Sequence, residues 1–255
     1  MQQSLNKSFF QLDVIWRGCV SISVLILIWQ LVVMLCHVPP YILPTPLLVA
    51  KSLLQYADLI AHESLPTVIE TVIGFLCSAI FGILGALLLS YFRPARIWFL
   101  PILLISQALP TFAIAPLFVI WFGYGIASKI AITILMLFFP ITSAFYDGLK
   151  RTCPGYLELA QTMNASKWRI LWHIRVPAAL PALGSGLRVA ATFAPMGAVI
   201  GEWVGASHGL GFLILNANAR MQIDLMFAAL VVLVTATLLF YFLVDLFFKI
   251  MVNWQ

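Results

Sequence analysis

The sequence has very few charged residues for its length. Of its 255 residues, 9% are charged and 63% belong to the hydrophobic set, and the mean hydropathy is +1.05. An ordinary soluble domain is about a quarter charged and about half apolar. Too few charged side chains are present to cover a water-soluble particle of this size, which excludes a soluble globule. Any function that needs a large soluble domain must come from another chain.

The sequence also lacks the motifs of common catalytic and metal sites. Its four cysteines are far apart without a CxxC pair, and its four histidines are scattered, so we expect no metal site. No GxxxxGK[ST] sequence occurs, so the chain has no P-loop for ATP. Residues 205–209 fit the GxSxG pattern around Ser207, but that pattern needs an α/β sheet to complete a triad. We therefore predict no catalytic residue, no cofactor in this chain and no nucleic-acid partner.

Six apolar segments are long enough to cross a bilayer as helices. They are residues 18–36, 67–92, 97–120, 130–146, 180–200 and 225–248. The first follows Lys7 and Arg17 without a cleavage signature, so we expect it to be retained as a span. The sequence therefore predicts an all-α membrane protein with about six transmembrane helices, forming a single domain over residues 1–255.

The positive charges predict the orientation of these spans. With the N-terminus inside, the internal segments, together with Arg188 close by, hold eleven Lys and Arg residues. The external segments hold three, Lys51, Lys129 and Arg220. Such an excess is typical of cytoplasmic loops, so we expect a multi-pass protein with both termini in the cytoplasm. Arg188, at the start of the fifth span, can extend to the inner headgroups.

The outer segments differ from one another in composition. Residues 37–66 contain four prolines before residue 47, so we expect an extended start and then a short surface helix over residues 47–60. Residues 201–224 are rich in glycine and have few apolar runs.

The long inner loop, about residues 147–179, is polar and patterned, which makes it the best candidate for contact with a cytoplasmic partner. Pro154 predicts the start of a helix that reaches Met163, with Glu158 in its early half. Asn164 should end this helix, because asparagine tolerates the left-handed conformation.

A second helix is predicted after this turn. Ser166 can cap a helix over residues 167–175, which Pro177 should end. Small side chains at Ala160 and Ala165 would let another protein approach closely, and Glu158 offers a charge for pairing with an arginine on that protein.

An amphipathic helix lying on the bilayer is the alternative for this second helix. In that arrangement Trp168, Leu171 and Trp172 are buried, while basic side chains meet lipid headgroups. The basic side chains are Lys167, Arg169 and Arg175. The two interpretations are compatible, and membrane lipid is a predicted partner in either case.

The loop resembles the EAA loop of ATP-binding-cassette importer permeases. The resemblance is carried by Glu158-Leu-Ala160, Asn164-Ala-Ser166, Ile174, Pro177 and Pro181. The chain departs from the family pattern at Leu159, Asn164 and Val176, and each departure is physically mild. The likeness extends through Gly184, Gly186 and Arg188 and over the six-span layout, so it covers most of the chain.

This resemblance implies a type I importer permease with a cytoplasmic coupling helix in the bacterial inner membrane. The coupling helix would dock on a separate subunit that binds ATP, and the residues carrying this contact would be Glu158, Ala160, Asn164, Ala165, Ser166 and Pro177. A second permease copy, as a homodimer, would share the pore. An extracytoplasmic substrate-binding protein would dock on the outer loops.

The third and fifth spans contain the polar groups and breaks expected of a translocation path, since irregular backbone at membrane depth is tolerated beside protein or a wet cavity. The candidate path residues are Gln107, Thr111, Ser185, Thr192 and Glu202. Close packing of kinked helices is the alternative. For Glu202 we expect the carboxylate to face water, Arg220 or the path itself. The alternative is that it makes a structural hydrogen bond. Glycines at 197, 201, 205 and 209 predict a groove for backbone contact, although one helix is not expected to continue far beyond residue 201.

Residues 201–211, 218–222 and 224–228 look like the nitrate, sulfonate and taurine branch of these permeases, closest to those for hydroxymethylpyrimidine, a thiamine precursor. The same role for an alkanesulfonate, taurine or nitrate is the alternative. An ATP-independent carrier or channel and an intramembrane enzyme are rivals of other classes. An intramembrane enzyme should show paired carboxylates or a metal triad, and a carrier should show repeated halves. None of these features is evident in the sequence.

Overall fold

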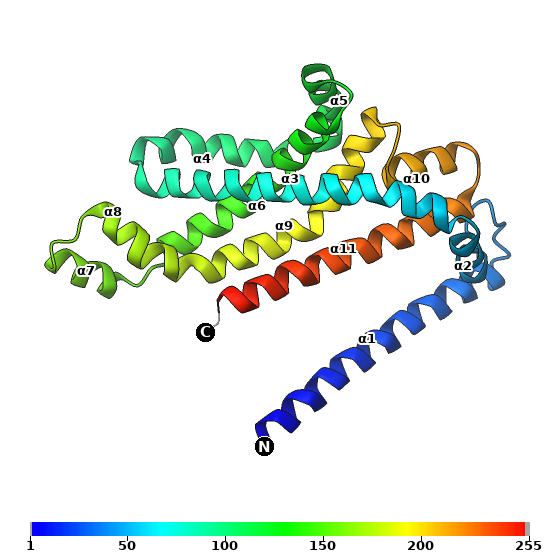
Figure 1. The fold of residues 1–255 in the computed structure, drawn as a ribbon, viewed down its shortest axis with the longest axis horizontal. Coiled ribbons are helices and arrows are strands. Elements are labelled where there is room, and N and C mark those ends of the chain that lie inside the picture. The colour runs from blue at the N-terminus through cyan, green and yellow to red at the C-terminus, as the bar shows by residue number, and fades with distance from the viewer. Residues whose placement is uncertain (1, 253–255) are drawn as a thin grey trace.

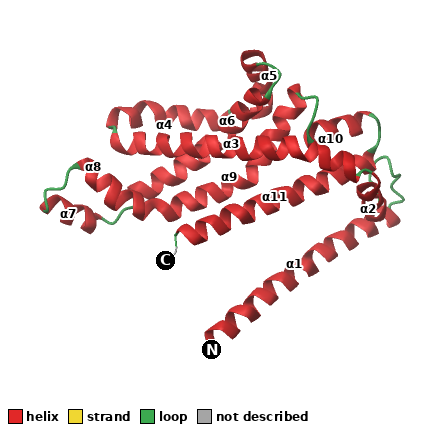
Figure 2. Ribbon diagram, in the orientation of Figure 1, coloured by secondary structure: helices red, strands yellow, loops and turns green. Residues whose placement is uncertain are grey.

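A computed structural model describes residues 2–252, and it describes side chains from residue 16 onward except at 19 and 93. Within this part every regular element is a helix and no strand occurs (Figure 2). The all-α prediction is therefore confirmed. The side chains of Lys7, Cys19 and Arg93, which entered the sequence predictions, lie outside the described side chains.

The helices follow one another with short connections. In chain order they are α1 (Gln2–Leu35), α2 (Pro46–Gln55), α3 (Ala57–Tyr91), α4 (Arg93–Ala108), α5 (Thr111–Phe122), α6 (Ile126–Lys150), α7 (Pro154–Thr162), α8 (Lys167–Ile170), the π-turn η1 (Leu171–Arg175), α9 (Val176–Gly205), α10 (Leu210–Ala219) and α11 (Ile223–Met251). Among the described residues, five helices are long and apolar enough to cross a membrane, and the number is six when the bent pair α4–α5 is counted as one broken span.

The crossings alternate between two ends of the molecule. α7, α8 and the junction of α3 with α4 lie at one end, which we name the α7 end (Figure 1). α2, α10 and the junction of α9 with α10 lie at the other, the α10 end. α1 and α11 both have their free ends on the side away from α2 and α10 (Figure 1). Six crossings of this kind bring the chain back to the side where it began.

The third crossing is not the single helix over residues 97–120 that the sequence predicted. α4 ends at Ala108, and α5 leaves at an angle of 106° to it. Leu109 and Pro110 connect them in an extended conformation. Proline has no amide hydrogen and disfavours helix at the residue before it, so Pro110 turns the chain here. Two other prolines, Pro101 and Pro116, remain inside helices.

The outer segment between the first two spans also differs from the prediction. Thr45 caps α2, because its hydroxyl accepts the Leu48 amide (3.3 Å), but α2 ends at Gln55 rather than near residue 60. Residues 57–66 instead form the first turns of α3, which continues through Pro66. The segment that was predicted to be a surface helix therefore lengthens a spanning helix.

The core is formed where α6 packs between α3 and α9. Gly74 on α3 and Gly197 on α9 both face Thr133 of α6, and a Cβ at either would lie within 3 Å of it. Gly201 meets Lys129 on α6 in the same way. The predicted groove of small residues on α9 is thus filled by α6. α9 also extends to Gly205, further than expected.

Candidate functional site

The inner loop forms a helix that ends in a tight left-handed turn. α7 begins at Pro154 as predicted. Asn164 has φ 56°, the left-handed conformation that asparagine tolerates. Its amide donates to the Gln161 carbonyl (2.9 Å), and the Ala165 amide donates to the Ala160 carbonyl (3.0 Å). Together these bonds make a Schellman motif, which pairs the last carbonyls of α7 and fixes its end.

The second helix of the loop begins as predicted but continues further. The Ser166 hydroxyl accepts the Arg169 amide (3.4 Å) and caps α8. The prediction that Pro177 ends this helix is wrong, because α8 runs through η1 directly into α9, with Pro177 in the first turn of α9. A proline cannot donate the usual helical bond, and a π-turn before it accommodates that loss. The loop is therefore joined to the fifth span by continuous helix.

The outward face of α7 is apolar. Tyr156, Leu159 and Met163 are 63%, 61% and 75% exposed, and their spacing of three and four places them on one face of the helix. Glu158 is exposed beside them. Ala160, predicted to lie against a partner, is instead buried within its own chain. Sequence reasoning did not single out the three apolar side chains, although their helical spacing was a usable signal.

The candidate path residues are distributed over three helices. Gln107 is exposed near the end of α4, and Thr111 is half-buried at the start of α5 beyond the bend. Ser185 and Thr192 are exposed on α9, where their hydroxyls donate to the carbonyls of Pro181 (3.2 Å) and Val189 (2.7 Å). No contact joins these positions into one site among the described residues, so the path remains a prediction.

Ser185 and Thr192 belong to a longer exposed stripe on α9. Most of α9 is buried, but this stripe is exposed. We name it the open face of α9, and it consists of Ser185, Val189, Thr192, Met196 and Trp203. The Trp203 ring also meets Phe112 of α5 edge-on, with centroids 6.2 Å apart.

The arginine beside the open face is already paired. Arg188 lies 2.6 Å from an Asp245 carboxylate oxygen on α11, and Lys249 lies 2.6 Å from the other oxygen. Arg188 thus has a protein partner that its sequence position alone did not predict. The open face therefore offers hydroxyl, aliphatic and aromatic groups.

Glu202 is buried, with only 1% of its surface exposed. One carboxylate oxygen accepts the Thr67 hydroxyl (2.6 Å), and the other accepts the Gly211 amide (2.6 Å). Arg220 is not among its hydrogen-bond partners in the described part of the chain. These contacts are the structural hydrogen bonds that were the alternative to a role in the path.

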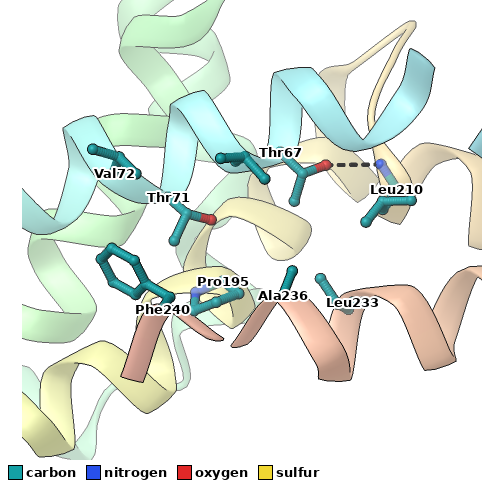
Figure 3. A pocket seen from close by; sticks show the side chains of 9 residues that line it. Thr67, Thr71, Val72, Pro195, Leu210, Leu233, Ala236 and Phe240 are labelled. Carbon is teal, nitrogen blue, oxygen red and sulfur yellow. Dashed lines mark hydrogen bonds between the residues drawn. The ribbon is translucent and has the colours of Figure 1, made fainter. Parts of the chain in front are cut away.

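Three side chains hold the start of α10, a helix that the sequence did not predict. Each of three consecutive backbone amides donates to one of these side chains. The Gly209 amide donates to Glu63 (2.6 Å), the Leu210 amide to Thr67 (2.8 Å) and the Gly211 amide to Glu202. Figure 3 shows the bond from Leu210 to Thr67 on α3. Helix N-termini expose such unpaired amides and attract negative charge, so two carboxylates and a hydroxyl from other helices supply the cap.

A small apolar cavity lies beside this cap, between α3, α9 and α11 (Figure 3). Thr71 and Phe240 line it together with Pro195, which interrupts the hydrogen bonds of α9. Its volume of about 40 Å³ is too small for a transported solute.

A buried ion pair joins α3 to α6 close to this network. The Lys129 ammonium donates to the Glu70 carboxylate at 2.5 Å, and both side chains are less than a tenth exposed. Lys129, counted among the cations of an external segment, lies in the first turn of α6, which begins four residues earlier than the predicted span. Since α3, α6 and α9 are all anchored here, the α10 end is held together by polar contacts.

The GxSxG segment has a structural explanation. Ser207 and His208 lie in the turn between α9 and α10, and Gly209 has φ 117°, which only glycine adopts without strain. His208 faces Glu63 at 3.5 Å, but no strand brings a triad together in residues 2–252. No group of three or more metal-ligating side chains occurs among the residues the structure describes.

Comparison with known families finds one match that covers most of the chain. Residues 74–254 match the family described as binding-protein-dependent transport system inner membrane component.

Three relatives are informative. A probable ABC transporter permease protein of Haemophilus influenzae is 52% identical, covering 88% of this chain and 91% of that one. A formylaminopyrimidine transport permease protein of Halalkalibacterium halodurans is 40% identical over 74% and 75% of the two chains. A riboflavin transport system permease protein of Chloroflexus aurantiacus is 34% identical over 92% and 89%. Permeases named for aliphatic sulfonates in Bacillus subtilis and for taurine in Escherichia coli also match, which confirms the predicted branch.

A solved structure supports the fold. The chain aligns to an amino acid ABC transporter with a TM-score of 0.62 at 17% identity, covering 78% of this chain and 97% of that one. The predicted importer-permease fold is confirmed.

Proposed function

Because this chain belongs to the family of inner membrane components of binding-protein-dependent transport systems, we propose that two copies form one pore and that a separate ATPase drives it through α7. The observation that carries the coupling role is the exposed face of α7 held by the Schellman turn at Asn164. An ATP-binding subunit and an extracytoplasmic binding protein complete the assembly. ATP is bound by the partner subunit.

The geometry of the inner loop supports transmission of force. α7 presents Leu159 and Met163 to the cytoplasm, and apolar side chains of this kind bury well in a groove on a partner. Glu158 beside them can pair with an arginine at the rim of that groove. Because α8 continues without a break into α9, a displacement of the docked loop moves α9 and its open face.

The open face of α9 is the surface we assign to the path. Its partner across the pore is the same face of the second copy, since a symmetric dimer places equal surfaces opposite each other. Two pore states with different exposure are sufficient for alternating access, and no deep pocket in one chain is required.

The substrate we propose is a thiamine-precursor pyrimidine such as hydroxymethylpyrimidine. The 40% identity to a permease named for formylaminopyrimidine favours this class. The chemistry of the open face agrees, because the cation beside it, Arg188, is already engaged by Asp245, a carboxylate that Lys249 also contacts. An anionic sulfonate or nitrate would be served better by a free cation, whereas a neutral ring can contact Met196 and Trp203.

The coupling role is tested at Asn164. In Asn164→Val a β-branched residue must adopt φ near 56°, which costs roughly 1–2 kcal/mol and loosens the end of α7. We expect ATP-driven uptake by the whole transporter to fall several-fold, with the assembly still inserted in the membrane. Asn164→Gly, which accepts this conformation freely, is the control and should transport normally. Equal uptake by both variants would show that the turn does not serve docking.

The substrate is tested by ligand retention and uptake. The binding protein encoded with this chain should retain a pyrimidine detectable by mass spectrometry. Proteoliposomes with the complete transporter should accumulate labelled hydroxymethylpyrimidine only with ATP. Accumulation of taurine or riboflavin instead would reassign the substrate and leave the permease role intact.

A further inference from the structure

A second site lies at the α7 end, where the chain forms a cavity with mostly polar walls. The cavity has a volume of about 560 Å³ and lies between the α3–α4 junction, α7, α8 and η1. Figure 1 shows these elements gathered at one end of the molecule. We name this cavity the basic pocket. Its polar lining consists of Ser90, Tyr91, Arg96, Gln161, Lys167 and Arg175.

The basic pocket carries three cations and no acidic side chain in its lining. Arg96, Lys167 and Arg175 come from three different elements, α4, α8 and η1, so the fold brings them together. None of the three forms an ion pair with the side chains that the structure describes, whereas Arg188, Lys249 and Lys129 each do.

One of these cations has a buried nitrogen without a partner in the described part of the chain, although the residue as a whole is only half-buried. The Nε atom of Arg175 is buried and has no hydrogen-bond partner among the described residues. A buried donor that is left unpaired costs free energy. An anion in the basic pocket would remove that cost, and Arg96 and Arg175 have the forked guanidinium that suits phosphate oxygens.

Exposed aromatic rings flank the pocket. The Trp168 ring lies edge-on to both Tyr91 (5.7 Å) and Trp172 (5.6 Å). Trp168 and Trp172 are 55% and 43% exposed on the surface of the chain, so both can reach a bilayer as the amphipathic-helix alternative requires, whereas Leu171 is buried within the chain. Tryptophan and tyrosine concentrate at the level of lipid headgroups. The rings therefore place the basic pocket at the membrane surface.

We infer that the basic pocket binds the phosphate group of an anionic phospholipid of the inner leaflet. This rests on the proposed orientation, in which the α7 end faces the cytoplasm. Ser90 and Gln161 supply neutral donors for the remaining headgroup oxygens. The lipid would tie the α3–α4 junction to α8 and so steady the loop that carries α7. Free phosphate shares this chemistry, and an acidic side chain of the ATPase is a competing occupant.

The test uses the full-length permease and its complex with the ATPase, purified in detergent with phosphatidylglycerol or phosphatidylcholine and analysed by native mass spectrometry. The pocket variant is R96Q/K167Q/R175Q. The matched control, R17Q/K150Q/R151Q, removes as many exposed charges from the predicted inner side without touching the pocket lining. Each basic residue at an anionic surface contributes about fivefold in affinity, so three give on the order of 100-fold.

We expect wild type and control to retain phosphatidylglycerol within about threefold of each other, with little phosphatidylcholine. The pocket variant should lose affinity for phosphatidylglycerol by on the order of 100-fold.

The other outcomes separate the possible occupants of the pocket. If inorganic phosphate alone displaces the lipid and needs the same three residues, the phosphate site stands and free phosphate is its source. Equal lipid retention by the pocket variant and the control overturns the inference. So does loss of ATPase capture in the pocket variant with lipid retention unchanged, since the pocket would then bind the ATPase. Absence of an ATPase from the wild-type complex would defeat the proposed function and leave the lipid comparison valid.

Discussion

Replacing Thr67 by valine removes one hydroxyl from the cap of α10 while preserving side-chain shape. That hydroxyl donates to the buried Glu202 carboxylate (2.6 Å) and accepts the Leu210 amide (2.8 Å). A bond to a charged group contributes about 1.5–3 kcal/mol, and a buried amide left unpaired costs about 1–3 kcal/mol. Thr67→Val should therefore destabilise the attachment of α10 by about 3–5 kcal/mol.

This loss should be local, because α10 is a short helix at one end of the molecule. Hydrogen exchange of peptides covering residues 209–219 reports its opening, and a loss of about 3–5 kcal/mol corresponds to exchange faster by roughly 100-fold to 3000-fold. Thr67→Ser keeps the hydroxyl and should exchange within a few-fold of wild type. If Thr67→Val exchanges as slowly as Thr67→Ser, the hydroxyl does not hold α10 and the cap has been misassigned.

Three further substitutions test separate parts of the structure. Lys129→Met leaves the buried Glu70 carboxylate unpaired and should destabilise the protein by about 3–5 kcal/mol in thermal unfolding. Adding Glu70→Leu should recover most of that loss, and an equally unstable double variant would contradict the pairing. Leu159→Asp should abolish capture of the ATPase without changing Tm, because the side chain is exposed, whereas the exposed Leu54→Asp at the opposite end should retain capture. Gly209→Ala would place a Cβ 2.2 Å from a Glu202 oxygen at φ 117° and should prevent accumulation of folded protein. Normal yield and Tm of this variant would refute the close approach.

The helical layout could largely be predicted because it follows from local properties. Spans need long apolar runs, and the turn at Asn164 and the cap at Ser166 depend on the residue types present. Five to six apolar spanning helices and both features of the inner loop are confirmed. The bend at Pro110 was missed because proline inside an apolar run is also compatible with a continuous helix, as Pro66 in α3 shows.

The polar network of the α10 end could not be predicted, because its members are distant in sequence. Thr67 and Leu210 are separated by 143 residues, and Glu70 and Lys129 by 59. Periodicity places each on a helix but does not say which helices pack together. The basic pocket was missed for the same reason, since Arg96 on α4 and Arg175 on η1 are far apart in the sequence.

The coupling role of α7 is tested most directly by disulfide crosslinking in inner-membrane vesicles. Met163 is replaced by cysteine in a chain whose four native cysteines are changed to serine, and the ATPase carries cysteines along its candidate groove. We predict a crosslink to the ATPase that changes in yield when ATP is bound, and none from Leu54→Cys. Failure of Met163→Cys to crosslink anywhere in that groove, together with its labelling by an impermeant reagent from the outer face, would contradict the assignment.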